Sequence, residues 1–343
     1  MTAMSFSSIT GHEFQKEFLI KSIEKGRVAN SYLFYGHEGI GKRLIALEFA
    51  KLLNCIRSDN GFIEKSQDLC NCASCLKITS SNHPDVTVVE PEDSSEIKVK
   101  QIREQIEDLV YLKPYEGKYK VCIVNNADFM NTNAQNAFLK TLEEPPLNAV
   151  IILITSKPQY LLKTIVSRCQ GLEFFRLSEK VIENAIGSNT EISSELSHTA
   201  VKLSQGSMSK AILLDANMIS ERKRIIETIA RLSCSNPVEL LEFIDSIATD
   251  KTAEGTRVLK LLFETLYLWL KDILYVKSEI SDEYLIHKDI SSITLNYSKR
   301  CSIEYILELQ QFLEQSWDAL FNRNVNKQYV LENLVIRFAN ARQ

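Results

Sequence analysis

This sequence of 343 residues lacks the features that would mark a membrane protein, a secreted protein or a strongly basic DNA-binding protein. No apolar run reaches membrane-spanning length, because the strongest one, residues 259–270, is broken by Lys260 and Glu264. The first residues lack a basic stretch followed by an apolar one, so we expect no signal peptide and a cytoplasmic protein. The net charge of -4 lacks the basic excess that is typical of a dedicated DNA-binding surface. The length suffices for two or three domains, each with its own core.

The clearest functional signal that is present is residues 36–43, GHEGIGKR. This stretch follows the apolar run 32–35 and precedes a helical pattern at 44–50. A strand, a glycine-rich loop and a helix in this order are typical of a phosphate-binding P-loop, whose backbone N–H groups and lysine cradle phosphates. The candidate nucleotide-binding residues are therefore Gly36, Gly39, Gly41 and Lys42. The alternative is that the glycines only make a tight turn.

The motif is incomplete where it would hold a metal ion. A P-loop ends in Ser or Thr, whose hydroxyl binds Mg²⁺, but this chain has Arg43 there. Beyond the apolar run 121–124, an ATPase has an Asp for Mg²⁺ and a Glu that polarises the attacking water, but this chain has Asn125 and Asn126. An amide is neither such a ligand nor a general base. We therefore expect neither intrinsic ATPase activity nor bound Mg²⁺, and a structural role for Asp128.

Eight cysteines are present, and four of them form a cluster of the pattern C-x14-C-x-C-x2-C. Because thiols stay reduced in the cytosol, such a cluster indicates metal binding before disulfides. Four thiolates satisfy tetrahedral zinc, and a closed site of this kind is structural. The alternative is a set of free surface thiols, but crowded thiols in a loop without a core favour zinc. We predict a structural Zn²⁺ in an irregular insert at 55–75, held by Cys55, Cys70, Cys72 and Cys75.

Short apolar strands alternate with helical patterns in the first half of the chain. The predicted strands are 32–35, 86–89, 121–124, 150–154 and 172–175, and the predicted helices between them include 9–25, 97–112 and 131–142. This alternation predicts a parallel sheet with helices on both faces. Strand signals stop at about Ser178, and residues 218–338 are helical throughout, with apolar faces wide enough to pack on each other or on partner subunits. Asn236 and Pro237 mark one helix start.

Further motifs make the chain similar to a known family. They are NHPD at 82–85, LKPYEG at 112–117, LKTLEEPP at 139–146, TS at 155–156 and SRC at 167–169. Together they resemble the bacterial clamp-loader branch of the AAA+ proteins, and within it most of all the delta-prime subunits of DNA polymerase III. The resemblance is dense over residues 11–169 and thin over the helical C-terminal part.

The resemblance implies a fold and a function. The fold is an AAA+ α/β domain of the P-loop NTPase type at 1–176 with the zinc-binding insert at 55–75. A small helical lid at 177–216 and an all-α collar at 217–343, which joins subunits into a ring, complete it. The implied function is that of a non-hydrolysing subunit of the polymerase holoenzyme. Its partners would be the gamma/tau and delta subunits of a hetero-pentamer, which places the sliding clamp on primed DNA during replication.

The resemblance also implies roles for single residues. Arg168, in the SRC motif, is implied to be an arginine finger that is offered in trans to ATP on the neighbouring subunit. The second-sensor arginine of active relatives falls at Ser209, a further sign that this chain's own site is inactive. The family's cysteines run C-x2-C-x2-C after the first, so Cys70 and Cys72 are one residue closer here.

Two other functions remain open. An ATP-hydrolysing subunit of the gamma/tau kind would require Ser or Thr at position 43 and acidic residues at 125 and 126, which this chain lacks. A free-standing zinc-containing module that binds nucleic acid is the second alternative, and the negative net charge weighs against it.

Overall fold

The computed structural model describes residues 6, 9–56, 70–92, 96–187, 194–214, 216–232, 236–249, 252–321, 323 and 325–341. The chain divides into two compact units. The first consists of Met1–Thr190 with Ser204–Leu213, and the second of Glu191–Leu203 with Leu214–Gln343. The predicted lid, 177–216, is shared between these units, so its status as a separate domain stays a prediction, as do the domain bounds of 1–176 and 217–343.

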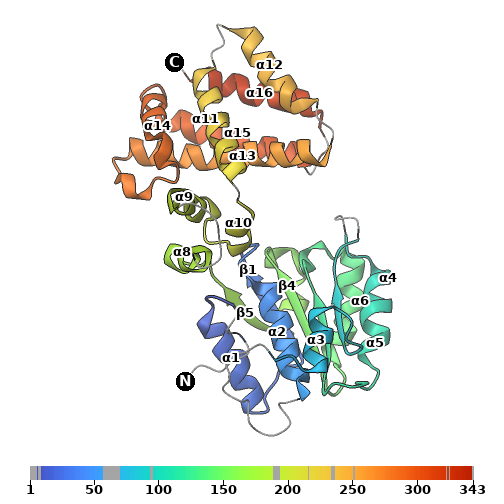
Figure 1. Cartoon of the computed structure of the whole chain (residues 1–343). Coiled ribbons are helices and arrows are strands. Elements are labelled where there is room, and N and C mark those ends of the chain that lie inside the picture. Colours follow the sequence, from blue (N-terminus) through green and yellow to red (C-terminus); the bar gives the residue numbers. More distant parts are fainter. Residues whose placement is uncertain are drawn as a thin grey trace. The chain divides into compact units, whose positions relative to one another are not determined.

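A five-stranded parallel sheet forms the centre of the first unit (Figure 1). Its order is β2-β3-β4-β1-β5, and every neighbouring pair is parallel. All five strands lie where the sequence predicts them, within one or two residues. They are β1 (Ser31–Gly36), β2 (Val86–Val89), β3 (Lys120–Val124), β4 (Ala149–Thr155) and β5 (Gln170–Phe174). Residues of β3 and β4 are buried throughout, as expected for strands covered on both faces.

Helices cover both faces of this sheet. Phe34 and Ile152 belong to one core with α1 and α2, whereas Leu33 and Leu153 belong to a second core with α4 to α7. The predicted parallel sheet with helices on both faces is therefore confirmed. The helices of this unit are α1 (Glu13–Glu24), α2 (Lys42–Asn54), α3 (Ala73–Thr79), α4 (Val99–Ile102), α5 (Asp108–Val110), α6 (Thr132–Glu143), α7 (Lys163–Val166), α8 (Glu179–Gly187) and α10 (Met208–Leu213).

Two predicted segments differ from the structure. The helix expected at 97–112 is interrupted by a π-helical turn, Arg103–Glu107, between α4 and α5. The insert expected to be irregular at 55–75 ends in α3, which begins because the Cys72 sulfur accepts the N–H of Cys75 at its first turn. Residues 57–69 of that insert lie outside the described residues.

The described part of the second unit is helical, as predicted. Helix α12 begins at the predicted place, because the Asn236 side chain accepts the N–H of Glu239 and Pro237 takes the first helical position. None of the helices in the described ranges is long and apolar enough to cross a membrane. The helices are α9 (Ser194–Ser204), α11 (Ala216–Arg231), α12 (Pro237–Ala248), α13 (Ala253–Lys277), α14 (Ser291–Ser298), α15 (Ile303–Phe321) and α16 (Lys327–Ala339), with short 3-10 turns at Asp282–Tyr284 and Lys288–Ile290.

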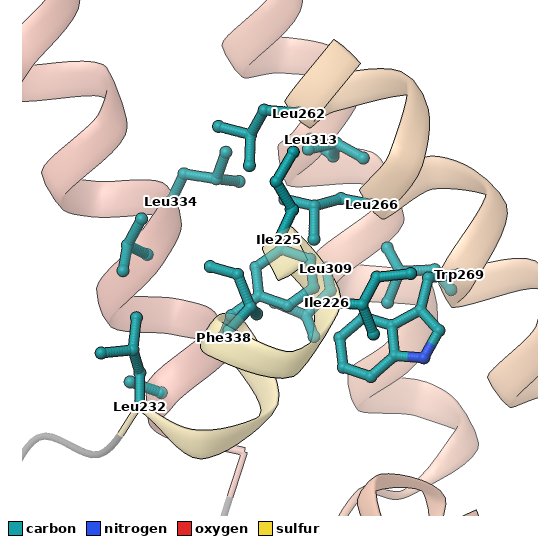
Figure 2. Close-up of a cluster of buried hydrophobic side chains, with 14 of the residues drawn as sticks. Ile225, Ile226, Leu232, Leu262, Leu266, Trp269, Leu309, Leu313, Leu334 and Phe338 are labelled. Atoms are coloured by element: carbon teal, nitrogen blue, oxygen red, sulfur yellow. The ribbon is translucent and has the colours of Figure 1, made fainter. Parts of the chain in front are cut away.

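Trp269 of α13 lies within the core of this second unit (Figure 2). It is fully buried, and its indole N–H donates to the Thr294 hydroxyl at 3.1 Å. Its ring lies 4.6 Å from that of Tyr297 and stacks on Phe338 at 6.5 Å, both measured between ring centroids. The indole thereby connects α13 with α14 and α16. It lies in a cluster of buried side chains that forms a separate hydrophobic core in this unit.

Candidate functional site

The carboxyl ends of the parallel strands meet at one edge of the sheet, where α/β proteins bind their ligands. The predicted phosphate loop follows β1, and the Asn125-Asn126 pair follows the next strand but one, β3. Glu90 follows β2 and Thr155 ends β4 at the same edge. The structure therefore brings together the two parts of the degenerate nucleotide site that the sequence predicts.

Glycine is required at two positions of the loop. Gly36 has φ 143°, and a Cβ there would lie 2.1 Å from the Phe174 carbonyl oxygen. Gly39 has φ 73°, and a Cβ there would lie 2.3 Å from the Ser207 hydroxyl oxygen. The Gly39 carbonyl also accepts the N–H of Ser209 at 3.0 Å. Ser209, where the family resemblance places the second sensor, thus contacts the loop through its backbone.

Lys42 is bonded to its own loop. Its ammonium donates to the carbonyl oxygens of Gly36 at 2.7 Å and His37 at 2.5 Å, and the residue is only 6% exposed. Burial lowers the pKa of Lys42 to about 8, against the opposing charges of Glu38 and Asp128. The two loop carbonyls thus engage the ammonium that would meet a phosphate.

Glu90 links the two positions that depart from an active site. Its Oε1 atom lies 3.0 Å from Nε of Arg43 and accepts a hydrogen bond from Asn125 at 3.1 Å. A cation and an amide donor therefore share the Glu90 carboxylate at this edge of the sheet. The sequence motifs did not point to Glu90, because it follows an ordinary apolar strand.

Asp128 and Thr155 form a second pair at this edge. The Thr155 hydroxyl donates to the Asp128 carboxylate at 2.6 Å and accepts the N–H of Lys157 at 2.9 Å. Thr155 is 1% exposed and Asp128 is half-buried, so this pair links the end of β4 to the turn Ala127–Phe129 that follows β3. Asp128 thus has the structural contacts that its place at a strand end suggested.

Arg168 lies at the opposite edge of the sheet. It precedes β5, whose first residue, Gln170, pairs with Tyr32, whereas the phosphate loop begins at the other end of β1, where Gly36 pairs with Phe174. At about 3.3 Å per residue, the five residues of β5 separate the two edges by about 16 Å. The guanidinium donates to the Thr164 carbonyl at 3.0 Å, lies 2.6 Å from the Glu143 carboxylate and keeps a side-chain exposure of 34%. The structure does not bring it to its own loop.

The four predicted zinc ligands lie together. Their sulfur atoms are all within 4.8 Å of one another, with Cys55 at 3.5 Å from Cys70 and 3.9 Å from Cys72. A Zn–S bond of about 2.3 Å in a tetrahedron places sulfurs about 3.8 Å apart, whereas a disulfide requires about 2.0 Å. The donor set and its spacing therefore fit a Cys₄ zinc site, held by the end of α2 and the start of α3.

The thiols also differ in acidity. Burial opposes ionisation of Cys72, but hydrogen bonds from the backbone of Cys75 and Ile56 outweigh it and lower the pKa of Cys72 to about 7. Burial, with the neighbouring thiols, raises the pKa of Cys75 far above its usual range. Four thiolates in one place need a cation, and a coordinated thiol is deprotonated outright. Bound Zn²⁺ would supply that positive charge.

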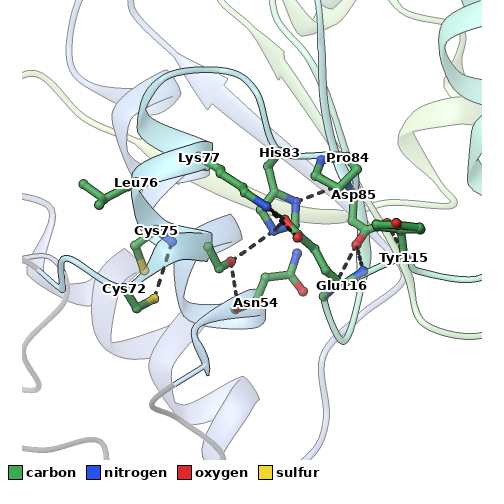
Figure 3. A network of polar contacts seen from close by, with 12 residues as sticks. Asn54, Cys72, Cys75, Leu76, Lys77, His83, Pro84, Asp85, Tyr115 and Glu116 are labelled. Atoms are coloured by element: carbon green, nitrogen blue, oxygen red, sulfur yellow. Dashed lines mark hydrogen bonds and ion pairs between the residues drawn. The ribbon is translucent and has the colours of Figure 1, made fainter.

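A buried polar network joins the cysteine cluster to the sheet (Figure 3). Ser74 donates to the Asn54 carbonyl at 2.8 Å and lies 3.0 Å from Nε2 of His83. Because Nδ1 of His83 accepts the N–H of Asp85 at 3.0 Å, Nε2 carries the proton and donates to Ser74. Burial lowers the pKa of His83, which favours this neutral form.

Asp85 is the centre of the network. Its carboxylate accepts the N–H groups of Tyr115, Glu116 and Gly117 at 2.7–2.8 Å and lies 2.8 Å from the Lys120 ammonium. Although burial opposes ionisation, these donors hold the pKa of Asp85 far below its usual range. The two motifs at 82–85 and 112–117, which entered only through the family resemblance, therefore bind each other.

Comparison with known proteins identifies the family. The model of the family described as "DNA polymerase III, delta subunit" matches residues 11–178, and that of "DNA polymerase III, delta subunit, C terminal" matches residues 216–340. The delta-prime subunit of Pseudomonas aeruginosa is 30% identical over 321 residues, which cover 91% of this chain and 92% of that protein. The chain is thus built like the polymerase III subunits of the AAA+ class. It belongs to the delta-prime family of DNA polymerase III subunits.

Other relatives match over shorter stretches. The delta-prime subunit of Bacillus subtilis is 41% identical over 170 residues, 50% of this chain and 49% of that protein. The tau subunit of the same organism is 35% identical over 178 residues, 52% of this chain and 30% of that protein. Among solved structures, a gamma-subunit-related protein of Thermotoga maritima has a TM-score of 0.45 at 16% identity, covering 95% of this chain and all of that one (100%).

Proposed function

We propose that this chain is a non-hydrolysing subunit of the DNA polymerase III clamp loader that provides Arg168 in trans to ATP on a neighbouring subunit. It assembles with gamma/tau and delta subunits in a hetero-pentamer and helps place the sliding clamp on primed DNA in the cytoplasm. The observation that carries the proposal is the position of Arg168, which is partly exposed and about 16 Å from the edge that bears its own loop.

The state of that loop supports the non-hydrolysing role. Lys42 is bonded to loop carbonyls, and the Glu90 carboxylate is shared by Arg43 and Asn125. Asn126 replaces the base that would polarise water. Mg²⁺ would therefore find neither the hydroxyl nor the strand-end carboxylate that active relatives use.

The same proposal covers the metal and the domain roles. One structural Zn²⁺ is held by Cys55, Cys70, Cys72 and Cys75, whose sulfur spacing suits tetrahedral coordination. The segment 177–216 acts as a lid, and the helices of 217–343 act as the collar that joins the subunits. Phosphoryl chemistry is left to the neighbouring subunit, to which this chain adds a guanidinium. In other nucleotide hydrolases such a finger accounts for about 10³–10⁵ in rate.

The test is Arg168→Ala in the loader reconstituted with gamma/tau and delta subunits. Turnover at the ATP site that Arg168 serves should fall by on the order of 10³-fold, because the transition-state charge loses its donor. Single-turnover ATP hydrolysis measures this, and gel filtration should show unchanged assembly. Arg27→Ala, at another exposed arginine of the first unit, is the matched control.

Two outcomes would contradict the proposal. Full turnover with Arg168→Ala would remove this residue from its assigned role. Robust Mg²⁺-dependent hydrolysis by the isolated wild-type chain would favour the gamma/tau-like alternative instead.

A further inference from the structure

The guanidinium of Arg168 is held by two partners although the side chain is partly exposed. One terminal nitrogen donates to the Thr164 carbonyl at 3.0 Å, and the other lies 2.6 Å from Oε1 of Glu143, whose side chain is 49% exposed. Thr164 belongs to the short helix α7 just before the arginine, and Glu143 is the last residue of α6. The contact with Glu143 therefore fixes the arginine against a separate element.

Helix α6 and the segment that leads into α7 are also joined by buried contacts away from this ion pair. The buried side chain of Gln135, on α6, donates to the Tyr160 carbonyl at 3.1 Å and accepts the N–H of Leu162 at 2.8 Å. Phe138 of α6 and Ile165 of α7 are completely buried in the same core. Glu143 thus ends a helix, α6, that packs directly on the segment before Arg168 and forms hydrogen bonds with it.

The pair leaves the arginine able to bind a phosphate. A guanidinium has five N–H donors in one plane. Thr164 and Glu143 engage two of them, one on each terminal nitrogen. Three N–H groups remain, which is more than a bidentate contact with two phosphate oxygens requires. Glu143 can therefore keep its contact while the finger works.

We propose that Glu143 is a positioning residue for Arg168, which holds the guanidinium in place before the neighbour's phosphate arrives. This inference rests on the proposed function. A surface ion pair of this exposure adds little to folding stability, so its effect is expected in catalysis. If Glu143 already holds the Arg168 side chain in one rotamer, the entropy cost of ordering that side chain is not added to the barrier of ATP hydrolysis.

The experiment compares Glu143→Ala with Glu144→Ala in the reconstituted loader. Glu144 is the adjacent exposed carboxylate, and it forms no ion pair with any residue that the structure describes. Glu143→Ala should lower kcat for ATP about 2- to 10-fold, the size expected for ordering one long side chain. The KM for ATP, the thermal midpoint and assembly should stay unchanged. Glu143→Gln, which keeps an acceptor oxygen, should recover part of the loss, and Glu144→Ala should behave as wild type.

A double-mutant cycle with Arg168→Ala separates the two proposals. If Glu143 acts through Arg168, then Glu143→Ala has no further effect once Arg168 is Ala. An undiminished or raised kcat of Glu143→Ala, or an effect that adds in full to that of Arg168→Ala, would overturn the positioning role while leaving the finger intact. If Arg168→Ala itself keeps full turnover, both the proposed function and this inference fail.

Discussion

The Asp85 carboxylate is 1% exposed and binds three backbone N–H groups as well as the Lys120 ammonium, which is itself buried. Asp85→Asn would remove the negative charge and leave Lys120 without its counter-ion. Breaking a buried pair in this way costs about 3–5 kcal/mol. We therefore expect the free energy of unfolding of the first unit to fall by about that amount in urea denaturation. Asp108→Asn, on the exposed surface, should change it by no more than about 0.5 kcal/mol.

The pH dependence of this difference identifies its origin. The pKa of Asp85 in the folded state lies below its unfolded value of about 3.9. A carboxylate with a depressed pKa contributes its full stability above the unfolded pKa and loses it as pH falls towards the folded one. The gap between wild type and Asp85→Asn should therefore be constant near neutrality and shrink below about pH 4. A gap that keeps its full size at pH 3 would show that the charge is not responsible.

At the scale of single elements, the strands were the easiest features to predict. Strands β3 and β4 are buried on both faces, so their sequences are continuous apolar runs that a periodicity argument detects. Helix α3 escaped notice because its first turn is capped by the Cys72 sulfur, a weak acceptor that is not among the usual capping residues. The π-helical turn Arg103–Glu107 left no signal either, since one extra residue in a turn barely changes an apolar pattern.

The candidate site shows the same division. The phosphate loop, the amide pair and the cysteines are recognised from local spacing, whereas Glu90 and the Ser74–His83 contact depend on residues that only the fold brings together. The partner of Arg168 is of the second kind, because Glu143 lies 25 residues earlier in the sequence. The spacing of residues in the sequence therefore predicts which chemical groups form the site. The partners that hold each group in place are seen only in the folded structure.

The metal prediction belongs to α3 and the end of α2. Purified wild-type protein should contain about one zinc per chain by elemental analysis, from the four-ligand count. Cys75→Ser should lose most of that metal, because it removes one of the four thiolate ligands. Cys75 lies in the first turn of α3, which another predicted ligand, Cys72, caps. Cys169→Ser, a thiol outside the cluster, should keep it. Wild-type protein that is free of metal and titrates with four reactive cluster thiols would contradict the Cys₄ assignment.

At the scale of the whole molecule, the two units have separate hydrophobic cores. The core of the second unit contains Trp269 and packs against Trp317, and these are the only two tryptophans in the chain. The cysteine cluster lies in the first unit, which has no tryptophan. Tryptophan fluorescence therefore reports unfolding of the second unit alone, whereas calorimetry reports both. A chain with two cores need not unfold in one step.

Removal of the metal should consequently separate the two signals. Chelation takes binding energy from the folded state of the first unit, and about 1 kcal/mol moves the midpoint of a unit of this size by roughly 2–4 °C. We expect the calorimetric transition of the first unit to fall by several degrees while the tryptophan midpoint stays in place. Leu266→Ala, in the core beside Trp269, should do the reverse, since such a truncation costs about 2–5 kcal/mol in the second unit. A tryptophan midpoint that follows metal removal degree for degree would mean that the units unfold together and that the metal stabilises the whole chain.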